Sequence, residues 1–170
     1  MIVTMNAQLT IHYISGTCSM GDILAAFTEK GLCQLTVDDT LAPQIEYLHQ
    51  NFPDANIAED TKNLNDSFRK IIEFVEHPVA ELPVPLDLHG TAFQKKVWQA
   101  LLESKPGKTM TYTELAQKIG KSDAVRAVGT ANGANKIAIL VPCHRIIRSD
   151  GNLGGYRWGL ERKKTLLNRE

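Results

Sequence analysis

The strongest constraint on the fold is a pair of closely spaced prolines near the middle of the chain. Pro83 and Pro85 lie two residues apart in the segment Glu81-Leu-Pro-Val-Pro-Leu-Asp-Leu-His89. Proline lacks a backbone donor and pushes the residue before it out of the helical region, so no helix can cross this segment. We therefore expect an extended connector between an N-terminal domain, residues 1–85, and a second domain, residues 86–170.

The formal net charge of zero hides opposite charges on the two sides of this connector. Residues 1–89 carry four Lys or Arg against thirteen Asp or Glu, a net charge of −9. Residues 90–170 carry fifteen Lys or Arg against six Asp or Glu, a net charge of +9. A basic half suits a polyanion such as nucleic acid, and the same division favours attraction between the two domains. The two interpretations are compatible.

The first half has the pattern of a small α+β scaffold. We expect three short strands that form an antiparallel sheet, with a tight hairpin at Lys30-Gly31, followed by two helices. The expected strands cover residues 9–15, 22–30 and 31–37, and the expected helices about 40–51 and 60–77. We find no chemical constellation here, and we interpret Cys18 as a loop residue and Cys33 as a strand residue.

The second half has the pattern of a mainly helical domain. Thr91-Ala-Phe-Gln94 and Thr111-Tyr-Thr-Glu114 fit the capping box, so helices should begin there. We expect helices at about 91–103, 112–119 and 122–134. The glycine-containing turn at Gly120 suggests a helix-turn-helix, although helical pairs in enzymes can look the same.

The third of these helices is unusual because small residues surround Arg126. A helix that reads the major groove needs long polar side chains, whereas small residues and one arginine suit a narrow groove. Such a helix could press against DNA and insert Arg126 into the base stack. The alternative is a close contact with another helix, which also requires small residues.

A cysteine with basic neighbours lies in the most distinctive segment. An apolar, β-like run at 137–141 leads to Pro142 and then to Cys143, His144 and Arg145. A cysteine after such a run is often an inert core residue, but cationic neighbours lower a thiol pKa, and a histidine can accept the proton. In an extended segment Cys143 and His144 would point to opposite faces, which favours a relay through water over direct contact.

Several features limit the other functions. Cys18, Cys33 and Cys143 have no zinc-like spacing and are odd in number, which suits unpaired thiols in a reducing cytosol. The opening MIVTMNAQLT lacks the features of a signal peptide, and no apolar run reaches the roughly 18 residues of a membrane helix. We expect a cytoplasmic protein with no metal, no cofactor and no membrane partner.

Several motifs occur in a family-specific order: GTAFQKKVWQAL, TYTELAQKIG, AVRAVGTANGANK, PCHRI and GGYRWGLERKKTLL. Over about residues 88–170 the chain resembles the O6-alkylguanine-DNA alkyltransferase family, also called methylated-DNA–protein-cysteine methyltransferases. YRWG is most similar to the alkylguanine-accepting domain of bacterial adaptive-response proteins. We expect no counterpart of the regulatory zinc domain that those proteins carry upstream. The resemblance implies an α+β fold with a ribonuclease H-like first domain and a winged helix-turn-helix second domain.

The resemblance also implies roles for individual residues. Cys143 matches the alkyl acceptor, His144 the base that activates it through water, and Glu170 the carboxylate that orients the histidine. Asn135 matches an asparagine that braces the turn before the cysteine, and Tyr112 a tyrosine whose hydroxyl faces the flipped base. The expected substrate contacts are Val141, Ile146, Tyr156, Arg157 and Trp158. The expected DNA contacts are Arg126, Ala127, Gly129, Thr130, Lys121 and Arg145.

The function implied is repair of double-stranded DNA through the minor groove by a monomer. One alkyl group would pass irreversibly from O6 of a flipped-out guanine to Cys143. Many relatives have small residues where this chain has Arg157 and Trp158, so we expect large alkyl groups to fit poorly. The main alternative is a winged-helix transcription regulator without transfer activity. A lesion-binding protein without transfer and a cysteine hydrolase are more distant possibilities.

Overall fold

A four-stranded mixed sheet forms the first half of the protein. The computed structural model describes residues 8–170, so most of the opening segment considered above lies outside the described residues. Strands β1 (Thr10–Cys18), β2 (Gly21–Thr28) and β3 (Gly31–Asp38) are antiparallel neighbours. Strand β4 (Asn56–Glu59) pairs in parallel with β1 and completes the order β3-β2-β1-β4.

The prediction of a three-stranded antiparallel sheet is therefore wrong, because it lacks the fourth, parallel strand. β4 has only four residues, is mostly exposed and contacts one edge of the sheet, so its sequence carries no clear alternation. The second helix, α2 (Asn65–Glu76), begins later than the expected residue 60. Asp60 instead accepts hydrogen bonds from the backbone N–H groups of Lys62 and Asn63, which form a turn before the helix.

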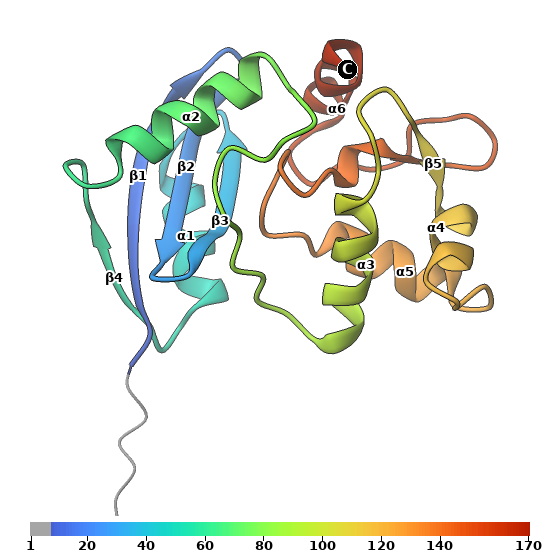
Figure 1. Ribbon diagram of the computed structural model, residues 1–170, viewed down its shortest axis with the longest axis horizontal. Coiled ribbons are helices and arrows are strands. Elements are labelled where there is room, and N and C mark those ends of the chain that lie inside the picture. The colour runs from blue at the N-terminus through green and yellow to red at the C-terminus, as the bar shows by residue number, and fades with distance from the viewer. Residues whose placement is uncertain (1–7) are drawn as a thin grey trace, which may run out of the picture.

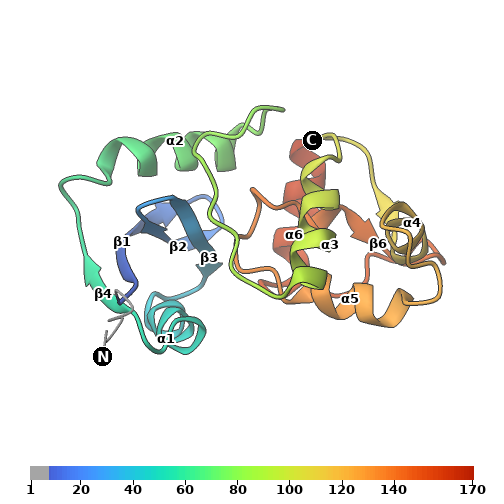
Figure 2. The same ribbon diagram turned by 60° about the horizontal axis from the view of Figure 1, so that its bottom comes forward.

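Two helices cover the two faces of this sheet. Helix α1 (Ala42–Asn51) lies on one face and α2 on the other (Figure 2). The alternation along β1 explains the arrangement, because Ile11 belongs to the core under α1 and Ile14 to the core under α2. Cys33 is a buried strand residue as expected, whereas Cys18 is the last residue of β1 and not a loop residue.

Helices dominate the second half, as predicted (Figure 1). They are α3 (Ala92–Leu102), α4 (Tyr112–Lys118), α5 (Val125–Gly133) and α6 (Leu160–Arg169). The capping box at Thr91 and Gln94 is complete, while at α4 the Thr111 side chain accepts from the Glu114 N–H. A two-stranded sheet joins β5 (Met110–Thr111) to β6 (Ile146–Ile147). The sequence analysis missed α6.

The apolar run at 137–141 is not a β-strand. Ile139 has a positive φ of 73°, which a β-branched residue rarely adopts, so the chain turns here. The segment nevertheless joins the two halves of the protein. Leu35 of β3 donates its N–H to the Lys136 carbonyl (3.0 Å) and accepts from the Ala138 N–H (2.8 Å). The edge of the first sheet therefore supports the chain directly before Cys143.

The core crosses the boundary between the halves. One apolar cluster includes Leu35 from the sheet, Phe74 from α2 and Trp98 from α3, together with Cys143. Among the residues described, no helix has the length and apolar character needed to cross a membrane.

Candidate active site

Cys143 is buried at the start of a short 3-10 turn, Cys143–Arg145, with 4% of its surface exposed. Burial raises the pKa of its thiol to about 11, although the hydrogen bond from Asn135 and the positive charge of Lys163 act in the opposite direction. The expectation that basic neighbours lower this pKa is therefore wrong for the resting protein, because loss of solvation outweighs them. At neutral pH the sulfur is a neutral thiol.

Asn135 contacts the turn before the cysteine. Its side chain is buried, and its Nδ2 lies within hydrogen-bonding distance of the carbonyls of Ile137 (3.1 Å) and Val141 (2.8 Å). The same nitrogen lies 3.3 Å from Cys143 Sγ. Its Oδ1 accepts from the Ile137 N–H (2.9 Å). One amide therefore fixes the backbone and offers the sulfur a donor.

His144 and Glu170 form a buried pair beside the cysteine. His144 Nε2 lies 2.8 Å from Glu170 Oε1, and each side chain is only 2% exposed. Burial lowers the pKa of His144, so the ring is neutral near neutral pH and its Nε2–H donates to the carboxylate. Nδ1 then carries the lone pair, and it is buried without a partner among the described residues. This nitrogen can therefore act as a base.

Cys143 and His144 are adjacent in a 3-10 turn and not in an extended segment, so the premise of opposite strand faces is wrong. Even so, the described residues contain no hydrogen bond between Sγ and the imidazole.

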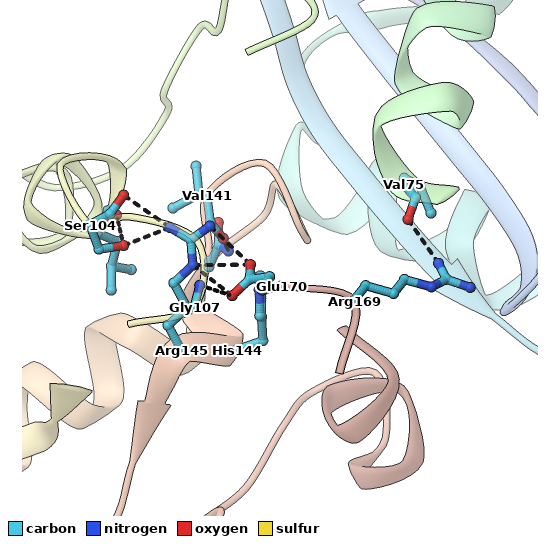
Figure 3. Close-up of polar contacts among 10 residues, drawn as sticks. Val75, Ser104, Gly107, Val141, His144, Arg145, Arg169 and Glu170 are labelled. Carbon is cyan, nitrogen blue, oxygen red and sulfur yellow. Dashed lines mark hydrogen bonds and ion pairs between the residues drawn. The ribbon is translucent and has the colours of Figure 1, made fainter. Parts of the chain in front are cut away.

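Arg145 holds the carboxylate and is not a surface contact. Its Nε and Nη2 donate to Glu170, and its Nη1 donates to the carbonyl and hydroxyl oxygens of Ser104, as Figure 3 shows. The side chain is 8% exposed. The expectation that Arg145 contacts DNA is therefore corrected: an arginine committed to a buried carboxylate cannot reach a phosphate. With His144, it lowers the pKa of Glu170 to about 2.

A cavity of about 380 Å³ opens beside the sulfur. Its walls include Tyr112, Cys143, Tyr156, Arg157 and Trp158, all of which the sequence analysis assigned to the site. Burial raises the pKa of Tyr112, so its hydroxyl remains protonated and able to donate. Helix α5 supplies the opposite wall through Gly129, Asn132 and Gly133.

Two of the expected substrate contacts do not line this cavity. Val141 and Ile146 are fully buried, and both act through their backbones. The Val141 carbonyl accepts from Asn135, and the Ile146 carbonyl accepts from Lys163.

The expected DNA contacts on α5 lie on its exposed side. Arg126, Ala127 and Thr130 are exposed, as is Lys121 in the turn before the helix. A second depression, about 700 Å³, contains Arg126 and Arg148 and shares Tyr112 and Gly129 with the cavity at Cys143. The exposed face of α5 is therefore continuous with the opening that leads to the sulfur.

Lys163 is a site residue that the sequence analysis missed. It is fully buried in α6, and its Nζ donates to the carbonyls of Ile146, Leu153 and Gly155. It thereby ties the turn after Cys143 to the loop before Tyr156. The spacing to Leu166, three residues on, could have placed Lys163 on the inner face of a helix. Within residues 8–170, no group of His, Cys, Asp and Glu side chains could hold a metal ion.

The site defines a class of protein in which a buried thiol lies in the wall of a cavity, next in the chain to a neutral histidine that pairs with a carboxylate. Comparison with known proteins narrows this class. Residues 92–170 match the family described as 6-O-methylguanine DNA methyltransferase, DNA binding domain. A methylated-DNA–protein-cysteine methyltransferase of Mycobacterium leprae is 53% identical over 162 residues, which cover 94% of this chain and 92% of that protein. The chain belongs to the family of methylated-DNA–protein-cysteine methyltransferases.

Two further similarities concern longer chains and bound DNA. The bifunctional transcriptional activator/DNA repair enzyme Ada of Escherichia coli is 44% identical over 163 residues, which cover 96% of this chain but 46% of Ada. This chain thus spans about half the length of Ada. The crystal structure of Mycobacterium tuberculosis OGT in complex with DNA superposes with a TM-score of 0.77 at 34% identity, covering 92% of this chain and 91% of that chain.

Proposed function

We propose that this protein repairs DNA by accepting an alkyl group, chiefly methyl, from O6 of guanine onto Cys143, once per molecule. The observation that carries the proposal is the buried Cys143 thiol in the wall of a cavity that adjoins α5, next in the chain to a His144 side chain that is paired with Glu170 through Nε2 and has no partner at Nδ1 among the described residues. The M. leprae relative, which this chain matches over nearly its whole length, supports the same activity.

The first chemical step is removal of the thiol proton. A thiol with a pKa of about 11 is a poor nucleophile at neutral pH, so it needs a base. His144 Nδ1 takes the proton, with one water as the relay, and Glu170 stabilises the imidazolium that forms. Because Arg145 also pairs with Glu170, the carboxylate stays ionised and oriented throughout.

The second step is displacement at the alkyl carbon. A carbon–sulfur bond forms as the carbon–oxygen bond breaks, and the electron pair of that bond passes to guanine. The Tyr112 hydroxyl donates to the leaving base and limits the charge that develops on it. Overall the thiol loses one proton and guanine gains one, so the charges balance. Arg157 and Trp158 narrow the cavity, which favours methyl over larger groups.

The partner is double-stranded DNA that contains O6-alkylguanine, bound through its minor groove by a monomer. Helices α4 and α5, joined through Gly120, act as the helix-turn-helix, and the β5–β6 pair as its wing. Arg126 enters the base stack, Lys121 contacts a phosphate, and Ala127, Gly129 and Thr130 allow a close approach. In the reaction the base rotates out of the duplex, because O6 faces the major groove in stacked DNA. The mycobacterial relative, whose structure was solved in complex with DNA, supports DNA as the partner.

In this proposal the halves, residues 1–85 and 86–170, are a ribonuclease H-like scaffold domain and the DNA-binding acceptor domain. A winged-helix regulator without transfer activity is the weaker candidate. A regulator of this kind would use the helices to bind DNA, but it would have no use for the buried thiol, imidazole and carboxylate.

Peptide mapping after reaction tests the proposal. The protein is incubated with a duplex that contains one O6-methylguanine, and the masses of its peptides are then measured by mass spectrometry. One methyl group should be found on the peptide that contains Cys143, and Cys143→Ser should bind the duplex normally but stay unmodified. The other cysteines are internal controls, since burial raises the pKa of the Cys33 thiol to about 12. A methyl group on Cys18 or Cys33, or unmodified wild-type protein, would contradict the proposal.

A further inference from the structure

The loop that closes one side of the Cys143 cavity is held from outside by the N-terminal half. Arg157 lies in this loop, between Gly154 and Gly159, which both have positive φ values (75° and 102°). Glycine in such a conformation adds little stiffness to a loop, so contacts with neighbouring elements must fix it. Two of the contacts that hold Arg157 come from residues distant in the sequence.

Arg157 is held between two elements. Its Nε donates to the Gly133 carbonyl at the end of α5 (3.3 Å). Its guanidinium lies over the Tyr47 ring of α1, with Cζ 4.8 Å from the ring centroid. This geometry is that of a cation–π contact. The arginine therefore links the wall of the cavity to a helix of the other half.

Trp158 is held through a second arginine. Arg162 donates one N–H to the Trp158 carbonyl (2.8 Å) and another to the Met20 carbonyl (2.9 Å). Its third contact is an ion pair with Asp39 (2.7 Å), which follows β3. Two N-terminal segments thus anchor the side chain that holds the loop backbone.

The support beneath Tyr47 is rigid. Gln44, one turn earlier in α1, is buried and binds the Thr36 hydroxyl, the Asp22 carbonyl and the Thr40 carbonyl. These bonds fix α1 against β3 and fix the position of Tyr47. Between α1 and the loop lies a second cavity of about 190 Å³, whose walls include Tyr47, Arg157 and Trp158. Arg157 and Trp158 also line the Cys143 cavity, so they separate the two spaces. If the loop were released, these side chains would have room to move away from the sulfur.

We infer that Tyr47 and Asp39 are positioning residues that determine which alkyl groups can react with Cys143, because they hold Arg157 and Trp158 against its cavity. This inference rests on the proposed alkyl transfer. The N-terminal half, which contributes no side chain to the walls of the Cys143 cavity among the described residues, thereby sets the size of the group accepted. The contact with Tyr47 is the main one, since the Asp39 side chain is 88% exposed and its ion pair is screened by solvent.

Single-turnover rates on two substrates test the inference. The same duplex carries either O6-methylguanine or O6-benzylguanine, and the ratio of the benzyl rate to the methyl rate is compared between variants. Tyr47→Leu should raise this ratio about two- to fivefold, the range that one exposed cation–π contact supports. Tyr47→Phe keeps the aromatic face and should keep the wild-type ratio. Tyr13→Leu is the matched control, because Tyr13 packs on the same core as α1 but does not line either cavity.

An unchanged ratio in Tyr47→Leu would overturn the inference. An equal loss on both substrates, together with a lower melting temperature, would also overturn it, because Tyr47 would then be merely structural. Acrylamide quenching of tryptophan fluorescence provides a readout that does not require transfer. Trp98 is buried in the core, so an increase in quenching reports release of Trp158. The increase should be large in Tyr47→Leu and smaller but detectable in Asp39→Asn. Wild-type quenching in both variants would contradict the inference, whereas absence of methyl transfer by the wild-type protein would contradict the proposed function.

Discussion

At the scale of single residues, the burial of Cys143 determines what its neighbours must do. The thiol is protected from solvent, and its pKa is raised to about 11, so it does not react as a free thiolate. In the proposed mechanism, the buried Nδ1 of His144 accepts the thiol proton once the alkyl group is in place. Reactivity is thus restricted to the occupied site.

Replacement of the base should change how the reaction depends on pH. Burial lowers the pKa of His144, so the base is already neutral at neutral pH, and the wild-type rate should stay nearly constant from there to about pH 9. His144→Gln should react about a hundredfold or more slowly at neutral pH. Its rate should then rise about tenfold per pH unit, because only the thiolate fraction reacts. Single-turnover rates across this range would decide, and a flat profile in His144→Gln would contradict the role.

Glu170 should dominate the response of stability to acid. Its pKa is lowered from 4.5 to about 2 in the folded protein, so its contribution is fully present above pH 4.5 and is lost as the pH falls through about 2. Urea unfolding should show a constant difference between wild type and Glu170→Gln above pH 4.5. Below it, the difference should shrink by at most about 1.4 kcal/mol per pH unit.

The control for this measurement lies on the same helix. Glu161 has an exposed side chain (89%) in α6, and Glu161→Gln should not reproduce the acid-dependent difference. If it did, the effect would be a general one of charge and not a property of the buried pair.

The residue scale also shows what sequence can reveal. Motif order led to Asn135, His144 and Glu170, and the structure brings Asn135 into contact with Cys143 and His144 into contact with Glu170. It failed for Arg145, since a basic residue beside a reactive cysteine can face solvent or a buried carboxylate, and only the fold decides. The predicted direction of the Cys143 pKa shift was wrong for a similar reason. The sequence shows the charged neighbours of the thiol, but it does not show how deeply the thiol is buried.

At the scale of elements, sequence signals predicted structure well where the hydrogen bonds join residues close together in the sequence. The Thr91 capping box marked the start of α3, because its hydrogen bonds involve residues three apart. Elements defined by distant partners were harder to predict. β4 forms only against β1, and the run at 137–141 becomes a turn that pairs with β3 at single residues.

Helix α5 presents Arg126 on the side of the protein where DNA is expected to bind. Arg126 is exposed beside the depression that leads to Cys143, so we expect it to stabilise a flipped base only in duplex DNA. Arg126→Ala should slow transfer from duplex much more than transfer from the free base O6-methylguanine. Rapid-quench rates on both substrates provide the test, and equal losses would mean that Arg126 has a structural role.

Lys121→Ala serves as the comparison for Arg126→Ala. It should weaken binding about equally for all sequences and reduce the salt slope of binding by about one. The rate of transfer from DNA that is already bound, relative to the rate of transfer from the free base, should stay as in the wild type.

At the scale of the whole molecule, the charge division has two uses. Arg162 and Arg169 pair with Asp39 and Glu76 across the boundary between the halves. Other basic residues, including Lys95, Lys108 and Lys121, are exposed and available to a polyanion. Composition predicted both possibilities, but it could not say which basic residues serve which use, because that depends on how the two halves pack.

If each molecule accepts only one alkyl group, the stoichiometry of the reaction will show it. A thioether has no carbonyl carbon for water to attack, so neither His144 nor its water can expel the alkyl group from Cys143. With O6-methylguanine duplex in large excess, repaired DNA should appear in one burst equal to the amount of active protein, with no steady phase afterwards. Sustained turnover without added thiol would contradict the account.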